Sequence, residues 1–415
     1  MAKILSTWLQ WIDGQHTKNM DLSLERVAVV AERLGLLQLK CPVITVAGTN
    51  GKGSCVAILE AIYLAAGYRV GAFTSPVLFK HNEYVRVQGV ACEDDIFCRA
   101  YETIAAVLED ITLTPFEFVT LAALLIFRES ALDVILLEVG LGGRFDAVNV
   151  INADVAIVTS IGIDHVEWLG HTCEAIGFEK AGIFRKNHPA VCGDFSPPVS
   201  LVNYAIQIGA EFFCQGKDFG FVQKDKKWDW FSLSRKLENL PLPTLSLQNM
   251  ASALMAVELL EKKLPATRDS IEHALKNVYL PGRIEVIPGD VFKIFDVSHN
   301  PAAASFLADY LSQHPINGKT RAVFSMLADK DIAGTIDVIK SYIDGWFIAP
   351  LPVVRGASLD SLKKCFSFSV NSCSSIQEAF ANAIAISQLG DRVIIFGSFH
   401  VVSAIKSCIE ELKHA

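Results

Sequence analysis

The chain has 415 residues, which at roughly 150 residues per domain predicts two or three domains. Hydrophobic residues make up 51% of the chain and charged residues 20%, a composition that excludes a disordered or fibrous protein. The net charge of -8 lacks the basic excess that favours binding to nucleic acid or to an anionic membrane, so we expect neither partner.

The cysteines and the apolar segments indicate the compartment. Ten cysteines are scattered along the chain without CxxC spacing, which favours reduced thiols. The N-terminus lacks the cleavage site of a secretory signal. The longest apolar run, residues 118–127, is about half of the roughly 20 residues needed to span a bilayer. We therefore expect a cytoplasmic protein without a membrane segment.

Short β-branched runs alternate with segments of helical period in the first half of the chain. The runs are residues 42–48, 68–74, 133–139 and 154–162, and residues 55–67 have helical spacing. Strands that are buried on both faces of a parallel sheet read as continuous apolar runs. This half is therefore predicted to be a mostly parallel sheet covered by helices. Residues 212–243 are too irregular to assign.

The second half repeats this pattern on a smaller scale. Its apolar runs are residues 291–297, 320–326, 345–350 and 391–397, which predicts a second α/β domain. Two Pro-Gly dipeptides within residues 279–291 mark the boundary, because such pairs break regular structure. We predict domains at residues 1–284 and 285–415. The alternative is two ordinary turns within one large sheet.

A glycine-rich loop, GTNGKGS (48–54), joins the first predicted strand to a helix. Its backbone N–H groups and the helix N-terminus favour a bound anion, and Lys52 can reach the β and γ phosphates of a nucleotide. The loop departs from GxxxxGK[ST], because its first Gly is only three residues before the GK pair and Gly53 separates Lys52 from Ser54. The alternative is a tight turn.

Polar residues follow the other strands of this predicted sheet, at the edge where ligands bind in open α/β folds. Ser75 follows the second run, Glu138 ends the third, and Asp164 and His165 follow the fourth. A carboxylate beside a phosphate loop suits Mg²⁺, which prefers oxygen ligands. The alternatives are a Ser-Pro turn at Ser75, an ion pair of Glu138 with Arg144, and a structural hydrogen bond at His165.

Two further positions are ambiguous from the residues alone. Composition favours a solvated helix residue at Lys180. Asp296, His299 and Asn300 end a strand of the second domain before a helix that Pro301 can begin, which suits either a ligand crevice or a helix cap by Ser298 or Asn300. The residues by themselves predict an ATP-dependent two-domain enzyme that uses Mg²⁺.

Eight segments carry a resemblance to a known family. They are VAGTNGKGS, TSPVL, TPFEFVTLAAL, LEVGLGGRFDAVN, TSIGIDHVEWLG, EKAGIFR, LPGRIEV and FDVSHNPAAA, in this order. Together they resemble the folylpolyglutamate synthase family of the Mur-ligase superfamily from about residue 21 to residue 399, and SMLADKDIAGT and GSFHVV resemble its bifunctional form with dihydrofolate synthase activity. The resemblance implies a P-loop ATPase domain with a mostly parallel sheet and a smaller Rossmann-like C-terminal α/β domain.

The resemblance also implies a set of site residues. Those that match ATP-binding positions are Asn50, Gly51, Lys52, Gly53, Asn249, Arg283 and Asp296, to which we add His299. Those that match metal ligands are Ser75, Glu138, His165 and Lys180, the last as a carbamate formed with CO₂, which replaces the solvated alternative for this lysine. Lys52, Lys180 and His165 are the implied catalytic residues. The implied pteroate site consists of Met20, Asp21, Leu22, Thr114, Pro115, Phe116, Glu117, Phe145, Asp146 and Ala147.

The implied reaction adds L-glutamate to 7,8-dihydropteroate and to tetrahydrofolates through an acyl phosphate. The implied cofactors are ATP, one or two Mg²⁺ ions and the carbamate on Lys180, and a monovalent cation is compatible with the site. The implied enzyme is a monomer. Val77 and Tyr84 depart from the family's usual residues in the loop that covers the substrate, and Val148 replaces a usual Thr. The alternatives are a Mur-type amino-acid ligase, for which the 47 residues before the glycine loop leave no room for a UDP-sugar domain, and a P-loop regulator without ligase activity.

Overall fold

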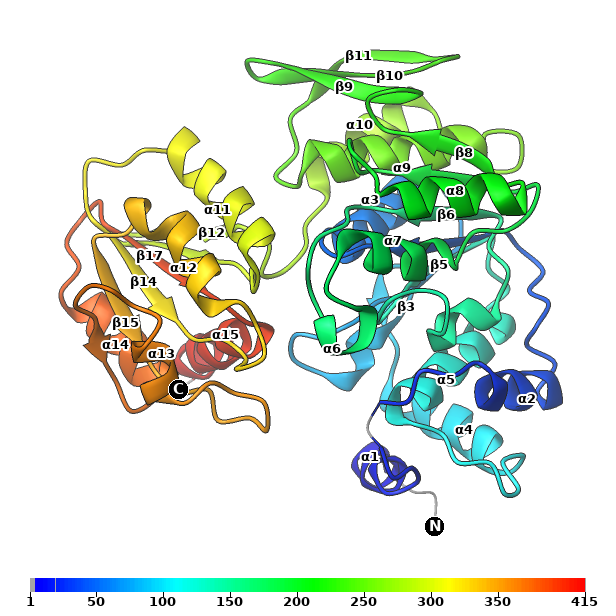
Figure 1. Ribbon diagram of the computed structural model, residues 1–415, viewed down its shortest axis with the longest axis horizontal. Helices are drawn as coiled ribbons and strands as arrows, with labels where there is room; N and C mark the ends of the chain where they lie inside the picture. Colours follow the sequence, from blue (N-terminus) through cyan, green and yellow to red (C-terminus); the bar gives the residue numbers. More distant parts are fainter. Residues whose placement is uncertain (1–3, 19, 415) are drawn as a thin grey trace. The chain divides into compact units, whose positions relative to one another are not determined.

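A computed structural model describes residues 4–18 and 20–414. The chain divides into two compact units, Met1–Tyr279 and Leu280–Ala415, and each is described by itself (Figure 1). Among the helices of these described residues, none combines the length and the apolar character needed to cross a membrane.

The first unit is built on an eight-stranded sheet in the order β4-β3-β2-β5-β1-β6-β7-β8. Its strands are β1 (Val43–Ala47), β2 (Val70–Phe73), β3 (Val85–Val87), β4 (Val90–Ala91), β5 (Val134–Glu138), β6 (Val155–Val158), β7 (Pro189–Cys192) and β8 (Glu211–Cys214). The strands from β2 to β8 in this order are parallel, and β3 and β4 add an antiparallel hairpin at the edge. The four strands predicted in this half and their parallel pairing are confirmed.

The helices of this unit cover the sheet. They are α1 (Leu5–Asp13), α2 (Glu25–Arg33), α3 (Lys52–Ala65), α4 (Asp94–Ala105), α5 (Pro115–Glu129), α6 (Val166–Leu169), α7 (Cys173–Ala181), α8 (Val199–Ile208), α9 (Leu247–Leu259) and α10 (Arg268–Asn277), with the 3-10 helices η1 (His81–Tyr84) and η2 (Ala147–Val150). Helix α3 packs on β1, β2 and β5 and against α9 and α10, which explains why it is apolar on nearly all sides.

A small antiparallel sheet occupies part of the segment that the sequence left unassigned. It consists of β9 (Phe219–Lys224), β10 (Lys227–Ser232) and β11 (Lys236–Pro241). This sheet packs on α9 and α10 (Figure 1). Trp228 and Trp230 of β10 are fully buried, and their indole N–H groups donate to the carbonyls of Pro241 and Ala251. These two rings anchor the sheet to the unit.

The second unit has a six-stranded sheet in the order β12-β13-β17-β14-β15-β16, parallel except for the edge strand β12. Its strands are β12 (Glu285–Ile287), β13 (Phe292–Phe295), β14 (Thr320–Phe324), β15 (Gly345–Ile348), β16 (Asn371–Ser372) and β17 (Arg392–Phe396). Its helices are α11 (Pro301–Gln313), α12 (Ile332–Ile339), η3 (Lys340–Tyr342), α13 (Leu359–Lys363), α14 (Ile376–Ala385) and α15 (Phe399–His414). The predicted second α/β fold and its four strands are confirmed.

Candidate active site

The glycine loop lies between the end of β1 and the first residue of α3, as predicted. Its backbone is fastened to the segment that follows β6: Thr159 Oγ1 donates to Asn50 O at 2.7 Å, and Thr49 N donates to Ser160 O at 2.8 Å. Lys52 Nζ folds back over the loop and donates to Gly48 O at 3.1 Å. The local strand, loop and helix therefore have the arrangement that holds phosphates elsewhere.

Asn249 of α9 reaches the same loop from far along the chain. A Cβ atom placed on Gly51 would lie 2.5 Å from both Nδ2 and Oδ1 of Asn249. The side-chain amide thus lies directly on the backbone at the start of α3. Gly51 and Asn249, both assigned to ATP by resemblance, are therefore neighbours in the fold.

Glu138, at the end of β5, lies beside both the glycine loop and the end of β2. Its carboxylate is 4% exposed, and Oε2 accepts from the backbone N–H of Ser75 at 3.1 Å. A Cβ on Gly53 would lie 3.4 Å from Oε2. The proposed alternative partner, Arg144, lies with its guanidinium 3.7 Å from the ring centre of Phe178. The Glu138 carboxylate therefore lies where it can hold a cation beside the glycine loop.

His165 and Asp164 follow β6 at the same edge of the sheet. His165 has a left-handed backbone (φ 51°, ψ 43°) as the residue before α6, an unusual conformation for a residue with a Cβ. The ring Nε2 of His165 lies 3.9 Å from Asp164 Oδ2, and the backbone N–H of His165 donates to Asp164 Oδ1 at 2.8 Å. Such strain is found where a side chain must be aimed at a ligand.

Lys180 is buried near the end of α7, with 3% exposure, so the solvated alternative is wrong. Its pKa is lowered to about 7, first by burial and then by the charge of Lys52, against the opposing effect of the Asp164 and Asp146 carboxylates. The same four side chains thus share one electrostatic environment. Sequence composition missed this burial because α7 carries polar residues on its other faces.

The loop of residues 140–147 lies against Lys180 and against α5. Arg144 N donates to Glu179 O at 2.8 Å, and a Cβ on Gly143 would lie 3.0 Å from the Cα of Lys180. On the other side, a Cβ on Gly140 would lie 2.5 Å from the ring of Phe116. The loop therefore joins the lysine to the segment assigned to pteroate.

That segment, residues 114–117, begins α5 with a capping box. Thr114 Oγ1 accepts from Glu117 N at 3.3 Å, and Glu117 Oε2 accepts from Thr114 N at 2.7 Å, with Pro115 at the first helical position. Phe116 packs on Phe73, with ring centres 5.8 Å apart. Phe145 is 45% exposed, so its ring is open to a ligand.

Asp146 has a structural function in addition to the one that was expected of it. Its Oδ2 accepts from Leu141 N at 2.8 Å and its Oδ1 from Val148 N at 3.0 Å. Burial raises the pKa of this carboxyl to about 6, although these backbone donors and Lys52 oppose the shift. The carboxylate, like the neighbouring Ala147, is buried and holds the loop in shape.

Residues 20–22 lie near the same loop. Met20 and Leu22 pack against an apolar cluster formed by Leu141, Leu169 and Ile176. Asp21 is bound by Arg26 of α2, whose guanidinium also contacts Glu117. Sequence analysis missed Arg26, because no local spacing connects it with a residue 91 positions along the chain.

In the second unit, Arg283 and His299 lie at the start of α15, and the charge of Arg283 acts on the nearby Asp296 carboxyl. Asp296 follows β13 and accepts from Ile284 N at 2.9 Å; burial raises its pKa, and Ser298 and Arg283 oppose the shift. Arg283 and His299 both face Phe399, at 5.1 Å and 6.1 Å from its ring centre.

Asn300 resolves one of the alternatives for this strand end. Its Oδ1 accepts from Ala303 N at 2.9 Å, so Asn300 is the cap of α11, and Pro301 is the first residue of that helix. Asp296 and His299 remain as the candidate ligand-binding residues of this cluster.

Comparison with known proteins identifies the family. Residues 46–203 match the Mur ligase middle domain, and residues 282–399 match the Mur ligase glutamate ligase domain. The chain is 43% identical over 409 residues to the dihydrofolate synthase/folylpolyglutamate synthase of Escherichia coli (strain K12). The aligned residues cover 99% of this chain and 96% of that protein. The chain belongs to the dihydrofolate synthase/folylpolyglutamate synthase family. It is an ATP-dependent ligase that adds glutamate to folates.

Solved structures of this family have the same fold. The E. coli FolC in complex with DHPP and ADP matches with a TM-score of 0.97 and 42% identity, covering 99% of both chains. A bifunctional folylpolyglutamate synthase/dihydrofolate synthase with Mn, AMPPNP and L-glutamate bound matches with a TM-score of 0.94 and 42% identity over 98% of both chains. These findings confirm the resemblance and set aside a peptidoglycan ligase and a regulator without ligase activity.

The metal ligands implied by the folylpolyglutamate synthase resemblance are not a conventional set. Within the described residues, no group of three or more His, Cys, Asp and Glu side chains is gathered for a metal. Of the four implied ligands, only Glu138 and His165 belong to these residue types. Ser75 and a modified Lys180 would supply the remaining oxygens, so the site fits a hard cation only with them.

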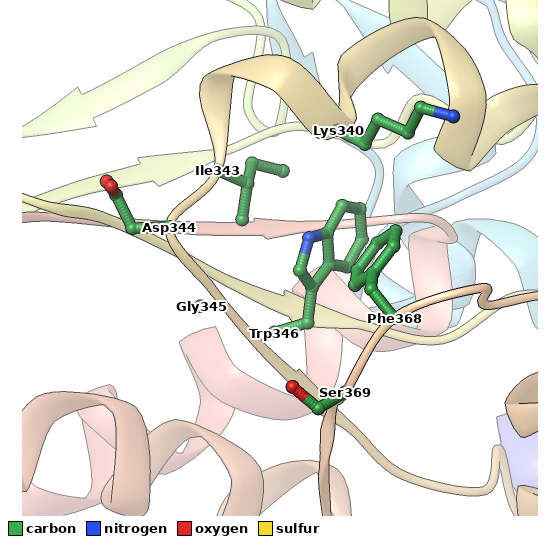
Figure 2. Close-up of a pocket in the computed structure, with 7 residues that line it drawn as sticks. All are labelled: Lys340, Ile343, Asp344, Gly345, Trp346, Phe368 and Ser369. Atoms are coloured by element: carbon green, nitrogen blue, oxygen red, sulfur yellow. The ribbon is translucent and has the colours of Figure 1, made fainter.

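The second unit also contains a hollow on its own surface (Figure 2). Its volume is about 280 Å³, and it is lined by Lys340, Ile343, Asp344, Gly345, Trp346, Phe368 and Ser369. Gly345 begins β15, whereas Asp296 follows the end of β13, and the strands of this sheet from β13 to β15 are parallel. The hollow is therefore at the opposite edge of the sheet from Asp296.

Proposed function

We propose that this ligase binds ATP through the glycine loop and joins L-glutamate to 7,8-dihydropteroate and to tetrahydrofolates. Asn50, Gly51, Lys52 and Gly53 would hold the phosphates. The observation that carries this assignment is the convergence of Lys52, Glu138 and Lys180 at one edge of a parallel sheet, next to a helix N-terminus. Asn249, from α9, adds a neutral amide at the first turn of α3.

In the second unit, Arg283, Asp296 and His299 are the residues that we assign to the nucleotide. Arg283 supplies a positive charge, and Asp296 supplies a buried carboxylate at the carboxyl end of β13. Arg283 and His299 both lie beside the ring of Phe399, and the charge of Arg283 acts on the Asp296 carboxyl, which supports a shared function. His299 is oriented by a hydrogen bond from its Nδ1 to Val297 O at 2.9 Å, which places a proton on that nitrogen.

We assign Ser75, Glu138, His165 and the carbamate of Lys180 as the ligands of Mg²⁺. A bound Mg²⁺ would offset the negative charge of the phosphates during transfer. Glu138 and Ser75 are already neighbours through a hydrogen bond. An unmodified Lys180 would be a poor neighbour for a cation, because both carry positive charge.

The carbamate on Lys180 is supported by the lysine's surroundings. Carbamate formation joins CO₂ to a neutral amine and releases a proton, so it needs a deprotonated lysine. Lys180 is buried next to Lys52, and both conditions lower its pKa toward neutrality. The product is an anion, which would turn a repulsion between Lys180 and Lys52 into an attraction.

The proposed reaction has two steps. A carboxylate oxygen of the pteroate attacks the γ-phosphorus of ATP, the bond to the β-phosphate oxygen breaks, and ADP leaves. The amine of glutamate then attacks the resulting acyl phosphate, an amide bond forms, and inorganic phosphate leaves. Lys52 would stabilise the charge on the transferred group, which is the main contribution that a protein makes to phosphoryl transfer.

For the pteroate we assign residues 20–22, 114–117 and 145–147. The exposed ring of Phe145 and the partly buried ring of Phe116 offer flat surfaces for the pterin. Asp146 would shape this pocket by holding the loop, since both of its oxygens accept backbone hydrogen bonds. The apolar contacts of Met20 and Leu22 bring the N-terminal segment to the same loop.

A coupled assay of ADP release tests the function. The purified enzyme is supplied with ATP and Mg²⁺ and with either dihydropteroate or tetrahydrofolate, in the presence and absence of glutamate. We expect turnover that requires both the folate substrate and glutamate. ADP release at the same rate with and without glutamate would contradict the proposal.

We also place the enzyme in the cytoplasm, as a monomer. The ten cysteines, all within the described residues, are free thiols, which suits a reducing compartment.

A further inference from the structure

We propose that Arg26 is a positioning residue for the pteroate pocket, where it holds residues 20–22 to the N-terminus of α5. This inference rests on the proposed function, because the pocket is the one assigned there. Arg26 belongs to none of the three segments that resemble the family's pteroate site. It enters the pocket's structure from α2, in the first turn of that helix.

The guanidinium of Arg26 connects the two segments directly. Its Nη1 donates to Asp21 Oδ2 at 3.2 Å, and its Nη2 donates to Asp21 O at 3.0 Å and to Glu117 Oε1 at 3.0 Å. A guanidinium presents its donors in a rigid plane, so one side chain can bind a carbonyl and two carboxylates at fixed relative positions. The distance between the segments is thereby set by one group.

Burial makes this connection strong. The Glu117 side chain is 4% exposed and the Arg26 side chain 22% exposed, so water competes little for either group. The second oxygen of Glu117 accepts from Thr114 N at 2.7 Å, which ties the ion pair to the cap of α5. Removal of Arg26 would leave a buried carboxylate without its counter-ion.

Among the described residues, Asp21 is also contacted by His16 and Lys18, neither of which belongs to α5. His16 Nε2 lies 3.3 Å from Asp21 Oδ2, while Met20 and Leu22 pack against the apolar cluster beside the loop of residues 140–147. Without Arg26 the segment would keep these contacts and lose its registration with α5. Phe116 is in the first turn of α5, so the spacing between the assigned pteroate residues would change.

The test compares Arg26→Ala and Arg26→Lys with the wild-type enzyme. A substrate pocket that is misplaced by about 1 Å loses on the order of 10- to 100-fold in rate. We therefore expect Arg26→Ala to raise the KM for dihydropteroate about tenfold or more. The KM for ATP should change less than about twofold, since the groups that accept hydrogen bonds from Arg26 belong to Asp21 and Glu117, which are not assigned to ATP. Arg26→Lys keeps the charge but cannot bridge three acceptors. Its KM for dihydropteroate should therefore lie between those of the wild-type enzyme and Arg26→Ala.

Arg33 provides a matched control on the same helix. Its Nη1 donates to Val107 O at 2.8 Å and Leu108 O at 3.0 Å, and its Nη2 lies 2.9 Å from Glu109 Oε2. These contacts are similar in kind to those of Arg26 but include no assigned pteroate residue. Arg33→Ala should leave the KM for dihydropteroate within about twofold of the wild-type value.

The outcomes separate the inference from the function on which it rests. An unchanged KM for dihydropteroate in a folded Arg26→Ala variant would overturn the inference, and so would an equal effect of Arg33→Ala. Should the alanine variant fail to fold, as a thermal melt would show, Arg26→Lys carries the same comparison. A wild-type enzyme that does not use dihydropteroate would refute the proposed function itself.

Discussion

The side chain of Asn249 lies directly on the backbone of Gly51, so that a Cβ at Gly51 would be 2.5 Å from both the amide nitrogen and the amide oxygen. Gly51 has a left-handed backbone, with φ 85° and ψ -1°, and precedes the first residue of α3. Glycine is therefore required here for two reasons, the backbone conformation and the close approach of α9. Together they shape the proposed phosphate site.

Gly51→Ala should raise the KM for ATP by on the order of tenfold or more, because Asn249 must move away from the loop and the loop must distort. Gly67→Ala is the control. Gly67 has nearly the same backbone (φ 87°), but nothing lies within 4 Å of its Cβ position. Both variants should lose about 1 kcal/mol of stability from the left-handed conformation. If the KM for ATP rose equally in Gly51→Ala and Gly67→Ala, the contact between Gly51 and Asn249 would have no special importance for ATP binding.

Lys52→Ala should lower kcat by on the order of a hundredfold or more, because the charge of this lysine acts most strongly when the phosphoryl group transfers. The fold should be retained, since Nζ donates to loop carbonyls such as Gly48 O, which need no side-chain charge to keep the loop closed. ADP release at saturating ATP, dihydropteroate and glutamate measures the effect. Near wild-type turnover in this variant would show that the nucleotide site is elsewhere.

Asp146→Ala should lower both stability and activity, because it leaves the buried N–H groups of Leu141 and Val148 without an acceptor. An unsatisfied buried group costs about 1–3 kcal/mol. The loop also contacts Lys180 and Phe116, so use of dihydropteroate and of tetrahydrofolate should both fall. Thermal melting and the two activities test this, with the exposed Asp110→Ala as control. A variant as stable as the control would mean that the loop is held by other contacts.

Sequence reasoning predicted which candidate site residues lie together at strand ends. Ser75 and His165 follow buried strands and Glu138 ends one, and parallel strands bring their carboxyl ends to one edge. The hydrogen bond between Ser75 and Glu138 is the direct result. Such residues can be found because a local pattern fixes their position in the fold.

The same reasoning failed where position depends on tertiary packing. The burial of Lys180 comes from the loop of residues 140–147, which covers α7, and composition carries no sign of it. The contact of Arg26 with Glu117 likewise joins two helices that no repeat relates. In the unassigned segment a signal was present: Trp228 and Trp230 alternate with polar residues, as in a strand with one buried face.

Stability should depend on pH through Lys180. Its pKa is about 7 in the folded protein and 10.5 for an ordinary lysine. Between these values the unfolded chain binds more protons, so stability rises with pH, whereas below about pH 7 the lysine is charged in both states. Lys180→Met removes this dependence. The stability advantage of this variant in urea unfolding should therefore shrink from about pH 7 to pH 10 in CO₂-free buffer without nucleotide. A constant difference would show that burial of the amine carries no free-energy cost.

The proposed carbamate on Lys180 leads to the sharpest prediction. As an ammonium, Lys180 would repel both Lys52 and Mg²⁺; as a carbamate it would attract them. Lys180→Ala should lose most activity, and acetate or formate should restore part of it by supplying the missing carboxylate oxygens. Lys180→Arg should remain inactive with either anion, because arginine keeps its charge and its bulk occupies the space.

Lys52→Ala is the matched control for the rescue, since it lacks a cation and acetate cannot replace one. A readout independent of activity comes from carbon-13 bicarbonate, which should give the wild-type enzyme a carbamate resonance that Lys180→Ala lacks. The carbamate assignment fails if Lys180→Arg is fully active, or if a metal-loaded crystal structure shows a bare amine at Lys180. It also fails if acetate stimulates Lys52→Ala as much as Lys180→Ala, because the rescue would then report a general effect of the anion rather than a filled ligand position.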